Sequence, residues 1–184
     1  QVLDKQRIKS LITIFIVIPL IFFSAYHASD LFKLRVDLAI SDLLSYSNES
    51  TTSLGLRLNF TLNSFDIIWK NPIIGVGTGD FPVEFKKINI INSPTLPYTT
   101  NPHNMYTLVL TQLGLVGLIS MLSIFYYQIK LSYNSSNKFF KDVGITLPLM
   151  FLVMMLSDSY LLGHFTTLMF VFFSSFLYKD FEKS

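Results

Sequence analysis

The sequence predicts an all-α integral membrane protein with about four transmembrane helices and a long outer loop, helical and irregular, between the first and the second. Only 14% of the 184 residues are charged, well below the roughly 25% of soluble domains. Hydrophobic residues make up 51%, and they gather in long runs instead of recurring with a regular period. The formal net charge of +2 provides no basic surface for nucleic acid, which is therefore excluded as a partner.

The first element, residues 1–29, is a short cytoplasmic flank and a transmembrane helix. Between Lys9 and Asp30 lie 20 uncharged residues, enough to cross about 30 Å of hydrocarbon. A secretory signal peptide is the alternative, but no cleavage site of the A-x-A kind follows and Pro19 lies inside the run. Because the chain begins with Gln1, we expect a piece of a longer protein.

The later elements are a second span at 106–129, a cytoplasmic loop at 130–142, a transmembrane hairpin at 143–178 and a cytoplasmic tail at 179–184. The hairpin turns at Asp158, and its first arm is short enough to be re-entrant instead. Basic residues favour the cytoplasmic side of a membrane, and eight lie in the short flanks: Lys5, Arg7, Lys9, Lys130, Lys138, Lys141, Lys179 and Lys183. The loop at 30–105, with 6 basic and 7 acidic residues, is therefore predicted to lie outside and to carry the chemistry.

Within the outer loop, the segment from Ser53 to Trp69 fits a helix better than a strand. Leu54, Leu58, Leu62, Phe65 and Trp69 form a helical stripe, although residues 54–62 also alternate as a strand would. Arg57 then lies on a polar stripe, where it binds an anion or, as the alternative, is merely solvated or in contact with lipid phosphate.

A glycine-rich segment follows, with Gly75, Gly77 and Gly79 at alternate positions. Such glycines permit positive φ and expose backbone N–H groups that can cradle a phosphate. The spacing matches neither G-x-G-x-x-G nor a P-loop, so a tight turn that redirects the chain is the alternative.

Before the second span, Thr100 or Asn101 is a candidate N-cap, and Pro102 fits the first helical position. His103 is then predicted in the first helical turn, where the helix dipole disfavours imidazolium and favours a neutral general base. A histidine that only anchors a helix end is the alternative. The chain has no cysteine, and its scattered histidines form no metal-binding pattern, so neither metal nor cofactor is expected.

In their order and spacing these segments resemble the O-antigen ligase and O-antigen polymerase superfamily. The resemblance covers about residues 53–120 and depends on the Arg57 helix, Asn71-Pro72-x-x-Gly75-Val76-Gly77-x-Gly79-x-Phe81, His103-Asn104-x-Tyr106 and Leu113-Gly114-Leu115-Val116-Gly117. It departs from the family at Gln112, where an acidic residue is frequent, and in length, because family members have about ten or more spans. The chain therefore resembles the C-terminal portion of a member.

The resemblance implies a multi-pass glycosyltransferase of the bacterial inner membrane, active on the periplasmic face in lipopolysaccharide or other surface polysaccharide biosynthesis. The donor would be a glycan on undecaprenyl pyrophosphate, and the acceptor a sugar of the lipid A core or, in a polymerase, another carrier-linked glycan. Carried over by position, the catalytic residues are His103 and Arg57, and the substrate-binding residues are Gly75, Gly77, Gly79 and Asn104. The chain alone is expected to be inactive, and a non-catalytic transport or structural fragment is the alternative from another class.

Overall fold

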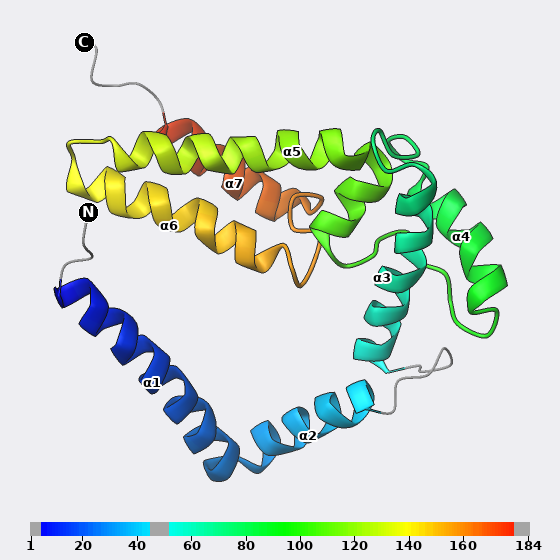
Figure 1. Cartoon of the computed structure of the whole chain (residues 1–184), viewed down its shortest axis with the longest axis horizontal. Helices are drawn as coiled ribbons and strands as arrows, with labels where there is room; N and C mark the ends of the chain where they lie inside the picture. The colour runs from blue at the N-terminus through cyan, green and yellow to red at the C-terminus, as the bar shows by residue number, and fades with distance from the viewer. Residues whose placement is uncertain (1–4, 45–51, 179–184) are drawn as a thin grey trace. The chain divides into compact units, whose positions relative to one another are not determined.

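The computed structural model describes residues 5–44 and 52–178, and every regular element in these ranges is an α-helix (Figure 1). The all-α prediction is thus confirmed for the described residues. The seven helices are α1 (Lys5–Ala28), α2 (Asp30–Leu44), α3 (Ser53–Lys70), α4 (Phe81–Asn92), α5 (Met105–Tyr133), α6 (Lys138–Met154) and α7 (His164–Leu177). They form two compact units, residues 1–47 and 48–184, which are described separately.

The first unit is a bent pair of helices. The part of α1 from Phe15 onward and α2 up to Asp42 meet at an angle of 107°. Ser29 ends one helix and starts the next, since its hydroxyl accepts a hydrogen bond from the Phe32 N–H at 3.3 Å. The Tyr26 hydroxyl donates to Asp37 at 2.6 Å and holds the bend. Residues 30–44 are therefore a second helix, at the place where the sequence predicted the start of a loop.

In the described part of the chain, α5 is the one helix that is long and apolar enough by itself to cross a membrane. The bent pair α1 and α2 passes the same test only when both are counted together. The predicted hairpin at 143–178 corresponds to α6 with 17 residues and α7 with 14, each shorter than the roughly 20 residues of a full span. One clear span is therefore observed, and four spans remain a prediction.

The second unit has two hydrophobic cores. The long helices α5, α6 and α7 enclose one of them, composed of Val109, Met121, Phe125, Leu147, Phe151, Met155 and Phe170. The second lies where α3 and α4 meet the beginning of α5, and consists of Phe60, Ile67, Phe81, Phe85, Ile88 and Leu108. Figure 1 shows α3 running across the end of α5 rather than along it, with α4 beside α3.

Between α3 and α4 lies a buried network of asparagine side chains. Asn63 donates to Asn59 at 3.1 Å and to Asn89 at 3.3 Å, while its own oxygen accepts from Asn92 at 3.1 Å. Asn59 donates to the Ser93 hydroxyl at 2.6 Å. Because buried amides are stable only when they are hydrogen-bonded, this network fixes one register of the two helices.

Helix α5 is sharply kinked at Gly114, whose φ of 62° and ψ of −159° are not helical. The glycine-rich segment after α3 takes up the backbone groups that the kink releases. Four hydrogen bonds of 2.9–3.1 Å connect the two segments: Val76 N–H to Thr111 O, Gly77 N–H to Gln112 O, Leu115 N–H to Pro72 O and Val116 N–H to Ile73 O.

Two glycines allow this close approach. A Cβ atom on Gly114 would collide with the backbone of Ile73 and Ile74, and one on Gly75 would collide with the backbone of Gln112 and Leu113. Both glycines also have positive φ, at 62° and 69°, which side-chain-bearing residues rarely adopt. The glycine-rich segment therefore serves as a brace for the kink in α5.

Candidate functional site

Three of the sequence-predicted site residues converge on one turn, residues 156–158, which follows α6. The Arg57 Nη1 atom donates to the Ser157 carbonyl at 3.4 Å, and the Asn104 side chain donates to the Leu156 carbonyl at 3.0 Å. The His103 Nδ1 atom lies 3.2 Å from Oδ1 of Asp158. Side chains from α3 and from the start of α5 thus meet at the end of α6.

His103 lies one residue before the N-cap of α5, not in the first helical turn, so that part of the sequence prediction is wrong. The N-cap is Asn104, whose side chain accepts a hydrogen bond from the Thr107 N–H at 3.0 Å. Asn101, one of the two expected caps, instead accepts from the His103 N–H at 3.0 Å and from the Ser159 hydroxyl at 2.7 Å. Both asparagines are good caps, and tertiary contact to Ser159 decides between them.

The backbone of His103 has a φ of 54°, which is unusual for a residue other than glycine. The turn made by Asn101 holds this conformation, and it directs the imidazole toward Asp158 instead of along the helix. The ring also stacks on Phe60 of α3, with 6.3 Å between centroids and 27° between planes. Three structural elements therefore fix the orientation of one imidazole.

His103 and Asp158 form a pair suited to acid–base chemistry. When Nδ1 carries the proton and donates to the carboxylate, Nε2 presents a lone pair, as a general base requires. No hydrogen bond joins Nε2 to any described residue. Both side chains are 36% exposed, so a substrate hydroxyl can reach the ring. Asp158 is held in turn by the Ser159 N–H at 2.7 Å.

Arg57 carries a positive charge that no carboxylate neutralises in the described part of the chain. Its one hydrogen bond there is the long contact to the Ser157 carbonyl, and its side chain is exposed. Several guanidinium donors therefore remain open to a ligand, and a planar guanidinium pairs best with a phosphate or a carboxylate.

The predicted phosphate-binding glycines are engaged elsewhere. The N–H of Gly75 donates to the Asn71 carbonyl at 3.0 Å and that of Gly77 donates to α5, so neither is open to an anion. Gly79 has a φ of 89° and open space around its Cα. The geometry favours the alternative of a redirecting turn for Gly75 and Gly77.

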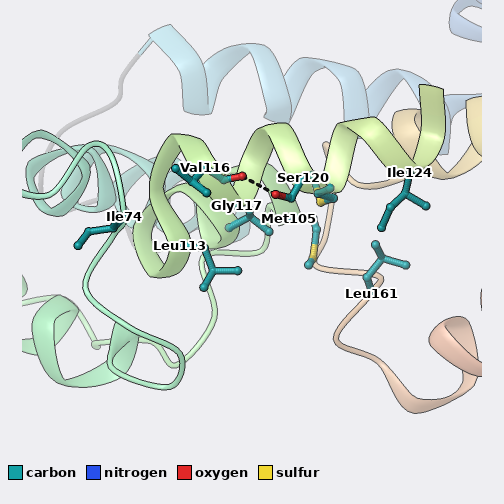
Figure 2. Close-up of a pocket in the computed structure, with 10 residues that line it drawn as sticks. Ile74, Met105, Leu113, Val116, Gly117, Ser120, Ile124 and Leu161 are labelled. Atoms are coloured by element: carbon teal, nitrogen blue, oxygen red, sulfur yellow. Dashed lines mark hydrogen bonds between the residues drawn. The ribbon is translucent and has the colours of Figure 1, made fainter. Parts of the chain in front are cut away.

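An apolar pocket of about 500 Å³ begins at Met105, directly after Asn104, and extends along α5. Figure 2 shows Leu161, from the turn between α6 and α7, facing the α5 side chains across the pocket, with Ile74 at the other end. Its lining is Ile74, Met105, Val109, Leu113, Val116, Gly117, Ser120, Met121, Ile124 and Leu161.

Asp158 is the site residue that the sequence did not assign. The sequence did indicate it in one way, because Asp158 is the single charge between two apolar runs. An ionisable residue between membrane-spanning segments is a candidate functional residue. Its partner lies 55 residues away along the chain, so only the fold pairs them. In the described residues, no three His, Asp or Glu side chains form a group that could hold a metal ion.

The profile of a protein family described as O-Antigen ligase matches residues 2–122. The matched range includes Arg57, the glycine-rich segment, His103 and the kink of α5, and it ends before the Asp158 turn. No curated protein matches the chain.

Proposed function

Because the chain belongs to the O-antigen ligase family, we propose that it transfers a glycan from undecaprenyl pyrophosphate to an acceptor sugar on the periplasmic face of the inner membrane. The family supports a membrane protein of lipopolysaccharide or surface polysaccharide biosynthesis. The observation that carries the finer proposal is the convergence of Arg57 and His103 on residues 156–158.

In the proposed reaction, Nε2 of His103 removes the proton from the acceptor hydroxyl. The hydroxyl oxygen then attacks the anomeric carbon of the donor as the bond to the pyrophosphate oxygen breaks. The electron pair leaves with the pyrophosphate, where the Arg57 guanidinium stabilises the developing charge. A single displacement inverts the anomeric configuration, and no metal takes part. Asp158 stabilises the imidazolium that forms, as an acidic partner does in other base-assisted transfers.

The apolar pocket beside Met105 has the right character for the prenyl chain of such a donor. It begins at Met105, next to Asn104 in the chain, and its lining is almost entirely hydrocarbon. A pyrophosphate at Arg57 and a chain along α5 would place the reacting carbon near His103. Asn104 is proposed to support the site by fixing the turn that carries Asp158.

There are two alternatives to a ligase, one a related enzyme and the other a non-catalytic protein. A polymerase of the same superfamily would use the same chemistry with a carrier-linked glycan as acceptor. A non-catalytic transport or structural fragment has no need for an arginine and a histidine at one turn, and the contacts of Arg57 and His103 with neighbouring residues of that turn favour the enzyme.

The test uses variants of the intact enzyme, because the chain alone is expected to be inactive. The variants complement a deletion strain, and surface glycan is the readout. We expect His103→Ala to reduce transfer by about 10²- to 10⁴-fold, the usual contribution of a general base. Arg57→Lys should also fail, because an ammonium lacks the planar pair of donors. His164→Ala and Arg35→Lys, which replace exposed residues of the same types elsewhere, are matched controls. Normal glycan from both His103→Ala and Arg57→Lys, at normal protein level, would refute the proposal.

A further inference from the structure

Helix α3 buries three polar side chains beside Phe60 and Ile67, and it exposes part of an apolar stripe. Asn59, Asn63 and Ser64 are buried toward α4 and the core. The stripe that the sequence predicted continues outward through Leu62, Phe65 and Trp69, and the exposed fraction of Trp69 is 79%. This is the reverse of a helix on the surface of a soluble protein, where the apolar side faces the core.

The apolar surface continues beyond the end of α3 into the brace. Ile73 and Ile74 are 66% and 73% exposed, and Ile74 lines the same apolar pocket as Val116 and Ile124 of α5 (Figure 2). Hydrogen bonds attach this segment to Leu115 and Val116. The outward surface of α3 and the surface of α5 are therefore continuous.

The part of α5 after its kink sets the level of this surface relative to a membrane. Leu115–Tyr133, which is 19 residues of α5, rises about 28 Å, close to the thickness of a hydrocarbon core. If this part crosses the membrane, as the proposed function requires, the brace at its first residues lies at the outer edge of the hydrocarbon. Helix α3, which runs across α5 (Figure 1), then lies along the membrane surface.

We infer that α3 is an interfacial helix, and that the surface formed by Leu62, Phe65, Trp69, Ile73 and Ile74 contacts the acyl chains of the outer leaflet. Trp69 is followed by Lys70, a pair typical of a membrane interface, where indole lies at the headgroup level and the lysine reaches water. Four backbone groups at the kink are paired with the brace, which helps to permit irregular backbone at this depth.

The chain provides its own probe, since Trp69 is its single tryptophan. The whole chain is reconstituted into phosphatidylcholine and phosphatidylglycerol vesicles that contain lipids brominated either near the headgroup end or near the methyl end of the acyl chain. We expect a blue-shifted emission and about a twofold loss of intensity with the shallow bromines, a smaller loss with the deep ones, and weak quenching by aqueous iodide.

The control moves the probe to α4, outside the apolar surface defined above. Lys87 of α4 has a side chain that is 63% exposed, and Lys87→Trp combined with Trp69→Phe should be quenched by iodide and not by bromine. Quenching of Trp69 by iodide alone would overturn the inference. Protection of Trp69 from both quenchers would overturn it in favour of a covering protein segment, and bromine quenching at both positions would overturn the one-sided placement. No glycan substrate is needed, so the outcome is independent of the proposed transfer activity.

Discussion

Replacing Asp158 by asparagine should weaken catalysis while preserving the fold. Asp158 has two partners, the imidazole of His103 at 3.2 Å and the Ser159 N–H at 2.7 Å. An asparagine oxygen can still accept the second hydrogen bond, so the turn at residues 156–158 should keep its shape. What is lost is the negative charge beside a ring that becomes positive during the reaction.

The size of the effect follows from that lost charge. A hydrogen bond to a charged group contributes about 1.5–3 kcal/mol, and each 1.36 kcal/mol changes a rate about tenfold. If the imidazole of His103 becomes positively charged only in the transition state, Asp158→Asn should lower kcat by about 10- to 150-fold, with little change in KM. The loss should be smaller than that of His103→Ala, because the base itself remains.

The assay is glycan transfer by membranes from cells that express each variant of the intact enzyme at equal level, with the initial rate measured at saturating donor. Ser157→Ala is the matched control, because Arg57 binds the carbonyl and not the side chain of Ser157, and it should retain a normal rate. A normal rate for Asp158→Asn would refute the role of the carboxylate. An increase in KM with unchanged kcat would show that Asp158 serves substrate binding instead.

Three further predictions concern the scaffold. Gly114→Ala should lower stability by more than about 2 kcal/mol, because the positive-φ backbone, which essentially only glycine adopts, and a collision with Ile73 add together. Gly79→Ala meets no neighbour and should lower stability by about 1 kcal/mol. Equal thermal unfolding midpoints in detergent would contradict the collision. Asn63→Ala should lower stability by about 1–3 kcal/mol by leaving buried amides unpaired, and an unchanged midpoint would show that the network has no such role. Alkaline phosphatase fused after Tyr98 should be active in the periplasm, and a cytoplasmic readout there would reverse the proposed orientation.

The sequence predicted where the helix α3 forms better than it predicted which face of that helix is exposed. The helix expected from Ser53 to Trp69 is α3, which ends one residue later at Lys70. Periodicity also identified the stripe on α3, but it could not show that the stripe faces outward, because that depends on the asparagine network with α4. The bend at Ser29 and the helix after it were not predicted individually, because this part was assigned only to an outer loop that was helical and irregular.

The candidate site was predicted in its residue types but not in its geometry. Arg57, His103 and Asn104 meet at one turn, although local rules placed His103 inside the helix. Asp158 could not be paired from sequence alone, because nothing in its neighbourhood indicates an imidazole 55 residues away. The glycine-rich segment was proposed to bind substrate, while its N–H groups of Gly75 and Gly77 bind protein backbone.

The brace between the glycine-rich segment and the kink of α5 also restricts how the chain can change in length. Two of its four hydrogen bonds join residues 76–77 to 111–112, and two join residues 115–116 to 72–73. Gly75 and Gly114 each lie against the backbone of the other segment. Inserting or deleting one residue between the two pairs of bonds, in either segment, would shift one pair relative to the other and disturb the contacts of both glycines. Natural variation in length should therefore be confined to places such as the stretch between α4 and Asn101, while these two segments keep a constant length even where their side chains differ.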